Sequence, residues 1–227
     1  MLDAVKHRGR DDRGTYIDDR IALGCDRLAI IDLVGGHQPV STENGTIWGV
    51  LNGEIYNHRE LRVILQRSGH RFNSSSDSEV VVHAYEEWGE ESFEKLNGMF
   101  ALAIWDGVKR ILVIARDRVG IKPLYYSRGD GTFAFASEAK SIVSARLLDS
   151  LAVNRTAVAQ LLEVGYLLAP MTMFEEIEQL APASFLICAG DSVATKAYWA
   201  PPAYNDEAPP IEMVSNTLRD CVVRQTE

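Results

Sequence analysis

The sequence predicts an α+β protein in which helices cover a mainly antiparallel β core. The first observation is that six apolar runs form consecutive pairs with short turns between them: 100–105 with 111–115, 124–127 with 132–136, and 185–188 with 193–198. The second is that helical patterns begin at capping residues or polar loops in four other stretches: 57–68, 76–88, 137–145 and 154–163. Paired strands with interspersed helices are typical of this class.

Composition divides the chain into three parts. Residues 1–199 carry all the predicted strand pairs and form one domain. Residues 200–210 hold four of the eight prolines and are predicted to be a linker. Residues 211–227 have helical spacing and are interpreted as the first helix of a second, truncated domain.

Charge and composition exclude several classes of function. The formal net charge of −9 argues against nucleic acid or an anionic membrane as the main partner. No apolar run has the length of a membrane span. The three cysteines and five histidines are scattered without metal-ligand spacing, so no metal site is expected. Free thiols fit a reducing compartment, and we expect a cytoplasmic protein.

The stretch 47–60 is the first candidate for a site. Its apolar residues 47–51 predict a buried strand that breaks at Asn52 and Gly53. A helix is then expected to begin with Asn57 as its N-cap and Glu60 completing a capping box. Backbone N–H groups and short polar side chains at such a junction face the adjacent crevice. A two-residue hairpin turn at Asn52 and Gly53 is the structural alternative.

Arg27 and Asp77 are two further charged residues with both a structural and a functional interpretation. Arg27 interrupts the apolar residues 21–31, interpreted as one strand, and a buried guanidinium needs an anionic partner. That partner is either internal, such as Asp32, or a ligand; a solvated position at the strand edge is the other alternative. Asp77 follows Ser76, a predicted N-cap that matches a capping box with Glu79, so it could simply favour the helix dipole.

The loop 116–123 is rich in charge although it lies between apolar strands. Its arginines and aspartates alternate, as Arg116, Asp117 and Arg118. We expect them to neutralise one another where the loop is covered.

Eight motifs in one order resemble the glutamine-hydrolysing asparagine synthetases, over residues 7–199. They are His7-Arg8-Gly9 with Asp11, Arg27-Leu28-Ala29-Ile30-Ile31-Asp32, Gln38-Pro39, Asn52-Gly53-Glu54-Ile55-Tyr56-Asn57, Ser76-Asp77-Ser78-Glu79, Leu96-Asn97-Gly98-Met99-Phe100-Ala101, Arg116-Asp117-Arg118-Val119-Gly120-Ile121-Lys122-Pro123-Leu124-Tyr125-Tyr126 and Phe135-Ala136-Ser137-Glu138. The similarity is to their N-terminal class II glutamine amidotransferase domain. It implies the αββα sandwich of the N-terminal-nucleophile hydrolases.

The resemblance also implies a chemistry. In this family the thiol of an N-terminal cysteine attacks the side-chain amide of glutamine, and the α-amine of that cysteine is the base. The implied oxyanion donors are the side-chain amide of Asn52 and the backbone N–H of Gly53. Six residues are implied to bind glutamine besides these two: Arg27 at the α-carboxylate, Asp77 and Glu54 at the α-ammonium, and Leu28, Ile30 and Ile31 along a strand lining the pocket.

The sequence departs from the family in places that matter for activity. The Met-Cys-Gly start that supplies the nucleophile is absent, and none of Cys25, Cys188 and Cys221 can use its own α-amine. Arg10, Cys25, Asp26 and Ala183 also differ from the family pattern. We therefore expect a fragment truncated at both ends that has no glutaminase activity by itself.

In the parent enzyme, released ammonia is implied to amidate aspartate in a synthetase domain that uses ATP and magnesium, whose Ser-Gly-Gly-x-Asp-Ser signature is expected beyond Glu227. No cofactor is expected in this fragment. The expected partners are glutamine here and an aspartate-like acceptor in the missing domain, with a homodimer left open. Two alternatives remain: another carboxylate acceptor, or a glutamine-binding or scaffold protein that has lost its nucleophile.

Overall fold

The structure is a computed structural model that describes residues 1–129, 131–148, 150–203 and 209–226. Parts of three sequence expectations lie outside these residues. They are the centre of the predicted turn at Asp130, positions 204–208 of the predicted linker, and Glu227 at the end of the last predicted helix.

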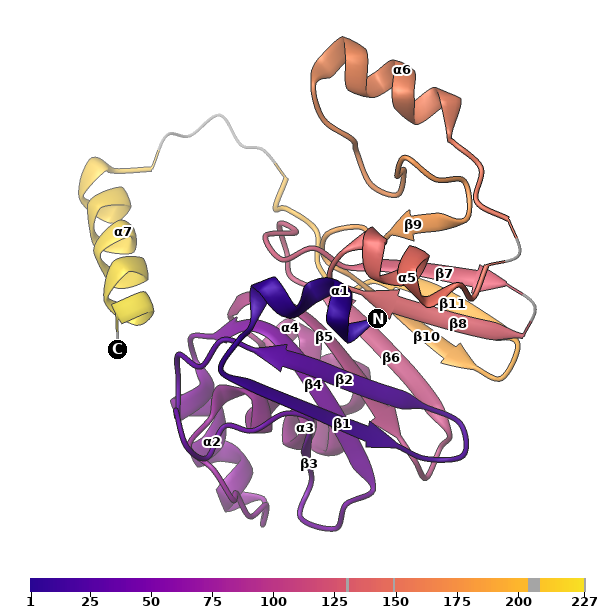
Figure 1. The fold of residues 1–227 in the computed structure, drawn as a ribbon. Coiled ribbons are helices and arrows are strands. Elements are labelled where there is room, and N and C mark those ends of the chain that lie inside the picture. The colour runs from indigo at the N-terminus through magenta and orange to yellow at the C-terminus, as the bar shows by residue number, and fades with distance from the viewer. Residues whose placement is uncertain (130, 149, 204–208, 227) are drawn as a thin grey trace.

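The centre of the fold is a six-stranded antiparallel sheet (Figure 1). Its strands lie in the order β11-β10-β6-β5-β4-β3. Their bounds are Val40–Ser41 (β3), Ile47–Ile55 (β4), Gly98–Asp106 (β5), Ile111–Arg116 (β6), Ser184–Ala189 (β10) and Ser192–Ala197 (β11).

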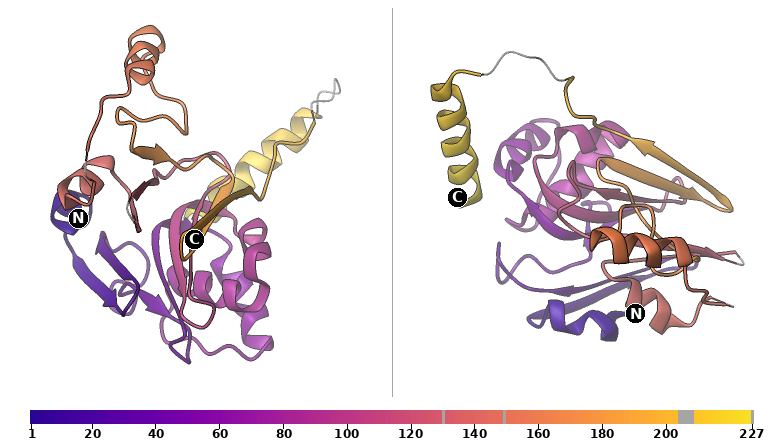
Figure 2. Two further views of the ribbon diagram at one scale, coloured as in Figure 1. Left: turned by 90° about the vertical axis from the view of Figure 1, so that its right-hand side faces the viewer. Right: turned by 90° about the horizontal axis from the view of Figure 1, so that it is seen from above.

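Two smaller sheets form a second β layer over one face of the central sheet. One pairs β1 (Asp12–Ile17) with β2 (Ala22–Arg27). The other has the order β8-β7-β9, with bounds Tyr125–Gly129 (β7), Thr132–Ala136 (β8) and Ile177–Gln179 (β9). Figure 2 shows the indigo strands β1 and β2 on one side of the central sheet and the magenta helices on the other.

Helices cover both outer faces of the two β layers. On the central sheet lie α2 (His58–Arg67) and α3 (Asp77–Trp88), followed by a 3₁₀ turn (Gly89–Glu91) and α4 (Ser92–Lys95). On the second layer lie α1 (Leu2–Val5), a 3₁₀ turn (Lys6–Arg8) and α5 (Ala139–Ala145). The remaining helices are α6 (Arg155–Val164) and α7 (Ile211–Thr226). None of the helices in the described ranges combines the length and the apolarity that crossing a membrane requires.

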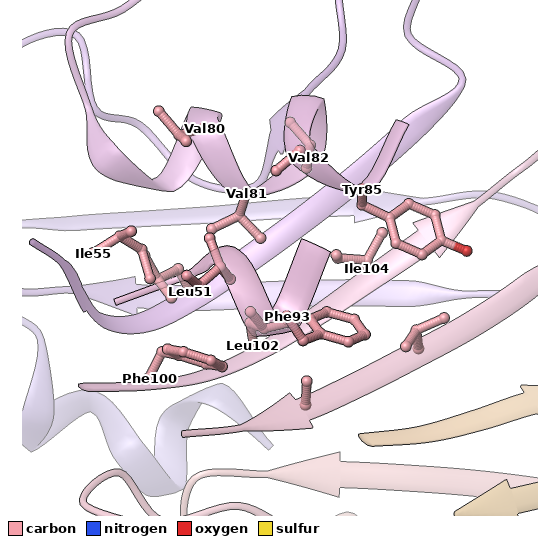
Figure 3. Close-up of a cluster of buried hydrophobic side chains, with 14 of the residues drawn as sticks. Leu51, Ile55, Val80, Val81, Val82, Tyr85, Phe93, Phe100, Leu102 and Ile104 are labelled. Carbon is pink, nitrogen blue, oxygen red and sulfur yellow. The ribbon is translucent and has the colours of Figure 1, made fainter. Parts of the chain in front are cut away.

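The strand β5 explains why the layers stack in this way. Its alternate residues Phe100, Leu102 and Ile104 belong to the core beneath α2 and α3, shown in Figure 3. The intervening Ala101, Ala103 and Trp105 belong to the core between the two β layers. Because side chains alternate across a strand, a strand that is apolar at every position must be covered on both faces. The predicted α+β sandwich is therefore confirmed.

Two boundaries near the candidate site differ from the sequence expectations. The strand β4 does not break at Asn52 and Gly53 but continues to Ile55. It then leads into the helix α2, so the alternative of a hairpin turn at Asn52 and Gly53 is wrong. Asn57 is the N-cap of α2, as predicted, but its side chain bonds Lys95 and Asn97 instead of the helix. The predicted capping box therefore does not form, because the side chain satisfies a neighbouring loop.

The start of α3 also differs from a reciprocal capping box. The Oγ of Ser76 accepts a bond from the N–H of Ser78, so Ser76 is the N-cap that the sequence predicted. The carboxylate of Glu79 instead accepts bonds from the N–H groups of Asn73 and Ser74, at 2.7 and 2.8 Å. Glu79 therefore holds the preceding loop.

The residues 21–31 are not one strand. β2 ends at Arg27, and residues 28–31 form a loop in which Leu28 and Ile30 are 59% and 62% exposed. The guanidinium of Arg27 bonds the carbonyls of this loop, which turns the chain away from the sheet.

The loop 116–123 does not use internal charge neutralisation as expected. Asp117 is fully buried and accepts bonds from four backbone N–H groups, those of Phe100, Val119, Ile121 and Lys122. Arg116 donates to three backbone carbonyls, those of Gly120, Lys122 and Leu180. The carboxylate of Asp117 and the guanidinium of Arg116 therefore form hydrogen bonds with backbone groups that the turns of this covered loop leave without a backbone partner.

Candidate functional site

A cavity of about 320 Å³ lies between β2 with its following loop, the end of β4, the start of α3 and the segment before α5. It contains every residue to which the sequence analysis gave a site role: Arg27, Leu28, Ile30, Ile31, Asn52, Gly53, Glu54 and Asp77. Its volume is at the lower end of the range of small-ligand sites, which suits a metabolite of amino-acid size. The fold thus brings together residues that are up to 50 positions apart in the chain.

Arg27 is the last residue of β2 and is only 8% exposed. Its Nη2 donates to the carbonyls of Ile31 and Asp32, at 2.5 and 3.0 Å. The carboxylate of Asp32 accepts instead from the N–H groups of Gly35 and Ser75, at 2.7 and 2.8 Å. Within the described ranges Arg27 takes part in no ion pair, so Asp32 is not the carboxylate partner that one alternative required. A buried guanidinium without a carboxylate favours an anionic ligand group.

The end of β4 is fixed on both sides of Asn52. The side-chain amide of Gln38 donates to the carbonyl of Leu51 at 3.1 Å and accepts from its N–H at 2.7 Å. The Nδ2 of Asn52 lies 3.4 Å from the Oγ of Ser137, in the segment before α5. An amide held in this way is a preorganised donor, the kind of group that stabilises a developing oxyanion.

Gly53 follows Asn52 with φ at +149°, a backbone conformation that L side chains rarely adopt. A Cβ at this position would also overlap the carbonyl oxygen of Met99 on β5. Only glycine therefore lets β4 lie this close to β5 and keep its backbone facing the cavity.

Asp77 is the first residue of α3 and is 6% exposed. Burial raises the pKa of its carboxyl, although the bond from the N–H of Ile55 and the neighbouring His58 partly oppose this effect. A favourable interaction with the helix dipole does not by itself explain an aspartate at this position, because the carboxylate of Asp77 is buried beside a cavity. Glu54, half-buried at the end of β4, is the other predicted carboxylate lining the cavity.

Contacts between distant motifs support the walls of the cavity, which Arg8 also lines. Glu138 accepts from Arg8 at 3.2 Å and lies 3.0 Å from His7, which joins the first motif to the last. Asp11 accepts from the N–H of Ala29 at 2.9 Å and so fixes the loop after Arg27. These contacts give structural roles to motif residues that the sequence left without one.

Gln38 and Ser137 are among the polar residues that line the cavity without a site role predicted from the sequence. They lie within the family-like motifs, 14 and 85 positions from Asn52 in the sequence. Only the motif membership could have indicated them. The contact of Gln38 with Leu51 follows from the pairing of β3 with β4, and that of Ser137 with Asn52 from the stacking of the two β layers.

One of the three cysteines also lines the cavity. Burial raises the pKa of the Cys25 thiol to about 11, so very little of it is thiolate near neutral pH. Cys188 belongs to a separate hollow, beside Arg20 and Trp105, and Cys221 is exposed on α7. The geometry therefore gives this cavity binding and oxyanion groups but no activated thiol from the described cysteines.

The family profile of the glutamine amidotransferase domain matches residues 1–199. The chain is 37% identical over 202 residues to asparagine synthetase [glutamine-hydrolyzing] 3 of Bacillus subtilis, which covers 88% of this chain and 33% of that protein. It is 46% identical over 144 residues to asparagine synthetase [glutamine-hydrolyzing] 2 of the same organism, covering 63% and 19%.

Among solved structures, glutamine phosphoribosylpyrophosphate amidotransferase from B. subtilis is similar with a TM-score of 0.54. The identity is 21%, and the match covers 78% of this chain and 35% of that one. This likeness supports the N-terminal-nucleophile type of fold. The chain spans about a third of the length of the curated synthetases that match most of it. The profile and these relatives agree with the motifs in the cavity, and the chain belongs to the glutamine amidotransferase domain family related to the glutamine-hydrolysing asparagine synthetases.

Proposed function

We propose that the cavity binds L-glutamine and that, in a complete enzyme, the ammonia released from it amidates aspartate. The observation that carries the proposal is the cavity itself, in which Asn52 and Gly53 share one space with a buried arginine and a buried aspartate. The arginine has no ion-pair partner among the residues that the structure describes. An α-amino acid carries one carboxylate and one ammonium, and these two charged residues match them.

Each lining residue has a role in the proposed site. Arg27 binds the α-carboxylate, and Asp77 with Glu54 binds the α-ammonium. Leu28, Ile30 and Ile31 contact the aliphatic part from the loop after β2. The amide of Asn52 and the N–H of Gly53 donate to the oxygen of the side-chain amide as it becomes an oxyanion.

The nucleophile of the proposed reaction is an N-terminal cysteine thiol whose own α-amine removes its proton. It forms a γ-glutamyl thioester and ammonia leaves; water then releases glutamate. Cys25, Cys188 and Cys221 are internal, so their backbone nitrogens are amides and cannot be that base. The 227-residue chain is therefore expected to bind glutamine without hydrolysing it.

The organisation of the complete enzyme is part of the proposal. Residues 1–199 are the glutaminase domain, 200–210 the linker, and 211–227 the first helix of a synthetase domain. ATP and Mg²⁺ act in that domain, where ammonia attacks an aspartyl-adenylate, and we place the enzyme in the cytoplasm. The relatives named as asparagine synthetases support aspartate over another carboxylate acceptor.

A calorimetric double-mutant cycle tests the glutamine site. L-glutamine and 4-aminobutanamide, which lacks only the α-carboxylate, are titrated into the wild-type chain and into Arg27→Ala. The wild type should prefer glutamine by about 10- to 100-fold, as expected for a charged hydrogen-bonded pair. Arg27→Ala should lose most of this preference. Arg20→Ala, at an exposed position outside the cavity, is the matched control.

The cycle separates a binding role from a structural one. Arg27 also bonds the loop 28–32, so its removal could weaken both ligands equally. Equal losses would mean that Arg27 only supports the loop. In the complete enzyme, Arg27→Ala should raise the glutamine requirement while free ammonia remains usable.

A further inference from the structure

A cluster of two histidines and two glutamates lies outside the glutamine cavity, on the side of the central sheet that carries α2 and α3. Glu43 lies in the turn between β3 and β4, and His70 follows α2. His83 and Glu86 lie on α3 with helical i, i+3 spacing, which places them on one face. One nitrogen or oxygen atom from each of the four residues lies within 4.8 Å of the others.

Several of these atoms are separated by distances close to the edge of a small coordination tetrahedron. The Nδ1 atoms of His70 and His83 are 3.3 Å apart. The Nδ1 of His83 lies 3.2 Å from the Oε2 of Glu43. The Nδ1 of His70 lies 3.5 Å from the Oε2 of Glu86 and 3.9 Å from the Oε1 of Glu43. Ligands about 2.05 Å from a tetrahedral zinc ion are about 3.3 Å from each other. The side chains therefore need little rearrangement to hold such an ion.

Burial adds a second, independent indication. His83 is 0% exposed, and the Oε2 of Glu86 is a buried oxygen with no hydrogen-bond partner among the described residues. This oxygen faces the Nδ1 of His70. A buried carboxylate oxygen that accepts no bond is unfavourable unless a cation compensates it.

The surroundings of the cluster resemble the outer shell of a metal site. His70 Nε2 lies within hydrogen-bond distance of Glu87, at 3.2 Å. His83 Nε2 has no hydrogen-bond partner among the described residues, and its nearest carboxylate is that of Glu79 at 3.7 Å. A carboxylate placed like that of Glu87 orients the imidazole of a metal-binding histidine.

The two glutamate ligands are themselves positioned by hydrogen bonds. The Oε1 of Glu86 accepts from the side chain of Asn44 at 3.0 Å. The Oε1 of Glu43 accepts from the N–H of Arg71 at 3.2 Å. These bonds hold each carboxylate in place before any ion binds.

We propose that Glu43, His70, His83 and Glu86 form a structural site for a divalent cation of the zinc class. Two imidazole nitrogens and two carboxylate oxygens are a donor set that zinc accepts. The ion would join the β3–β4 turn, the connection after α2 and the helix α3. That connection leads directly to Asp77, so the site would also fix one wall of the glutamine cavity.

The sequence alone predicts no metal site, because its histidines do not have ligand spacing. His70 and His83 are 13 positions apart, and Glu43 lies 27 positions before His70. Only the packing of α2, α3 and the β3–β4 turn brings them together.

Zinc titration of the purified 227-residue chain tests the proposal. The chain is stripped with EDTA, and binding of Zn²⁺ is measured by calorimetry and by the ion content after gel filtration. Co²⁺ serves as a spectroscopic probe, since a tetrahedral site gives intense visible absorption. One Zn²⁺ per chain and an increase in Tm with Zn²⁺ are expected.

Variants at the exposed and half-exposed glutamates keep the test independent of folding. Glu87→Gln changes only the outer shell and should weaken Zn²⁺ binding by about 10- to 100-fold. Glu43→Gln and Glu86→Gln each remove a ligand and should weaken it at least as much. His37→Asn removes an exposed histidine on another part of the surface and should bind like the wild type.

Two results would overturn the proposal. One is a wild-type chain that binds no stoichiometric Zn²⁺. The other is undiminished binding by both Glu43→Gln and Glu86→Gln. Glutamine binding is measured on the same samples, so loss of the metal site is distinguished from failure of the glutamine proposal.

Discussion

The carboxylate of Asp77 accepts a 2.9 Å hydrogen bond from the backbone N–H of Ile55. This bond joins the first residue of α3 to the last residue of β4, the strand that carries Asn52 and Gly53. The proposed ammonium-binding group and the proposed oxyanion donors are therefore held in one framework. A carboxylate that must be both buried and ionised to bind an ammonium lowers the stability of the free chain.

The variant Asp77→Asn should separate stability from binding. Because burial raises the pKa of Asp77, the protonated carboxyl favours the folded state, and this contribution is lost as the pH increases through the raised pKa. Asparagine can accept the same bond from Ile55 without a charge. At neutral pH, Asp77→Asn should therefore have a Tm at or above that of the wild type, yet bind glutamine much more weakly. Thermal unfolding and calorimetry measure the two effects.

The same raised pKa sets the pH dependence of glutamine binding. The ionised form of Asp77 binds the ammonium, so affinity should fall with decreasing pH, and the fall should begin above the range of an ordinary aspartate. Titrations from pH 8 to pH 4 measure this dependence. An affinity that does not change across this range would contradict the role of Asp77.

Gly53→Ala should destabilise the fold more than an alanine at another positive-φ glycine. At Gly53 both the backbone angle and the carbonyl of Met99 oppose a Cβ, whereas at Gly45 no atom lies within 4 Å of one. We expect about 1 kcal/mol of destabilisation for Gly45→Ala from strain alone and at least about 3 kcal/mol for Gly53→Ala. Urea unfolding of both variants measures the difference. Equal losses would mean that β4 can move away from β5.

Asp117→Asn should be strongly destabilising although it preserves the shape of the side chain. Both carboxylate oxygens accept backbone N–H groups, so the amide nitrogen of asparagine would face a donor in either orientation. Loss of such charged, buried hydrogen bonds is expected to reduce the free energy of unfolding by about 3 kcal/mol. Asp191→Asn, in the exposed β10–β11 turn, is the control and should change it little. A similar stability for both variants would contradict this account of the loop.

Cys25 should be a slow nucleophile although it lines the cavity. With its pKa raised to about 11, only about one thiol in a thousand is ionised at pH 8. Alkylation followed by mass spectrometry should modify the exposed Cys221 first and Cys25 much later. Equally fast labelling of Cys25 would reopen it as a candidate nucleophile.

The sequence predicted local features where one physical preference dominates. Asn154 was expected to begin a helix, and its Oδ1 accepts from the N–H of Ala157 at 3.0 Å at the start of α6. The paired strands β5 and β6 follow from apolar runs around a turn whose Asp106 accepts from Val108 and Lys109. The resemblance of the motifs indicated which residues share a cavity.

The tertiary structure decided where charged and polar side chains find their partners. Asn57 bonds the loop at residues 95–97 rather than its own helix. Arg27 bonds the backbone carbonyls of Ile31 and Asp32 rather than the carboxylate of Asp32. The convergence of His70 with His83 has the same origin. Apolar periodicity and capping act within a few residues and are encoded locally. The partner of a buried polar group is set by whichever segment packs against it, so it is determined only when the layers assemble.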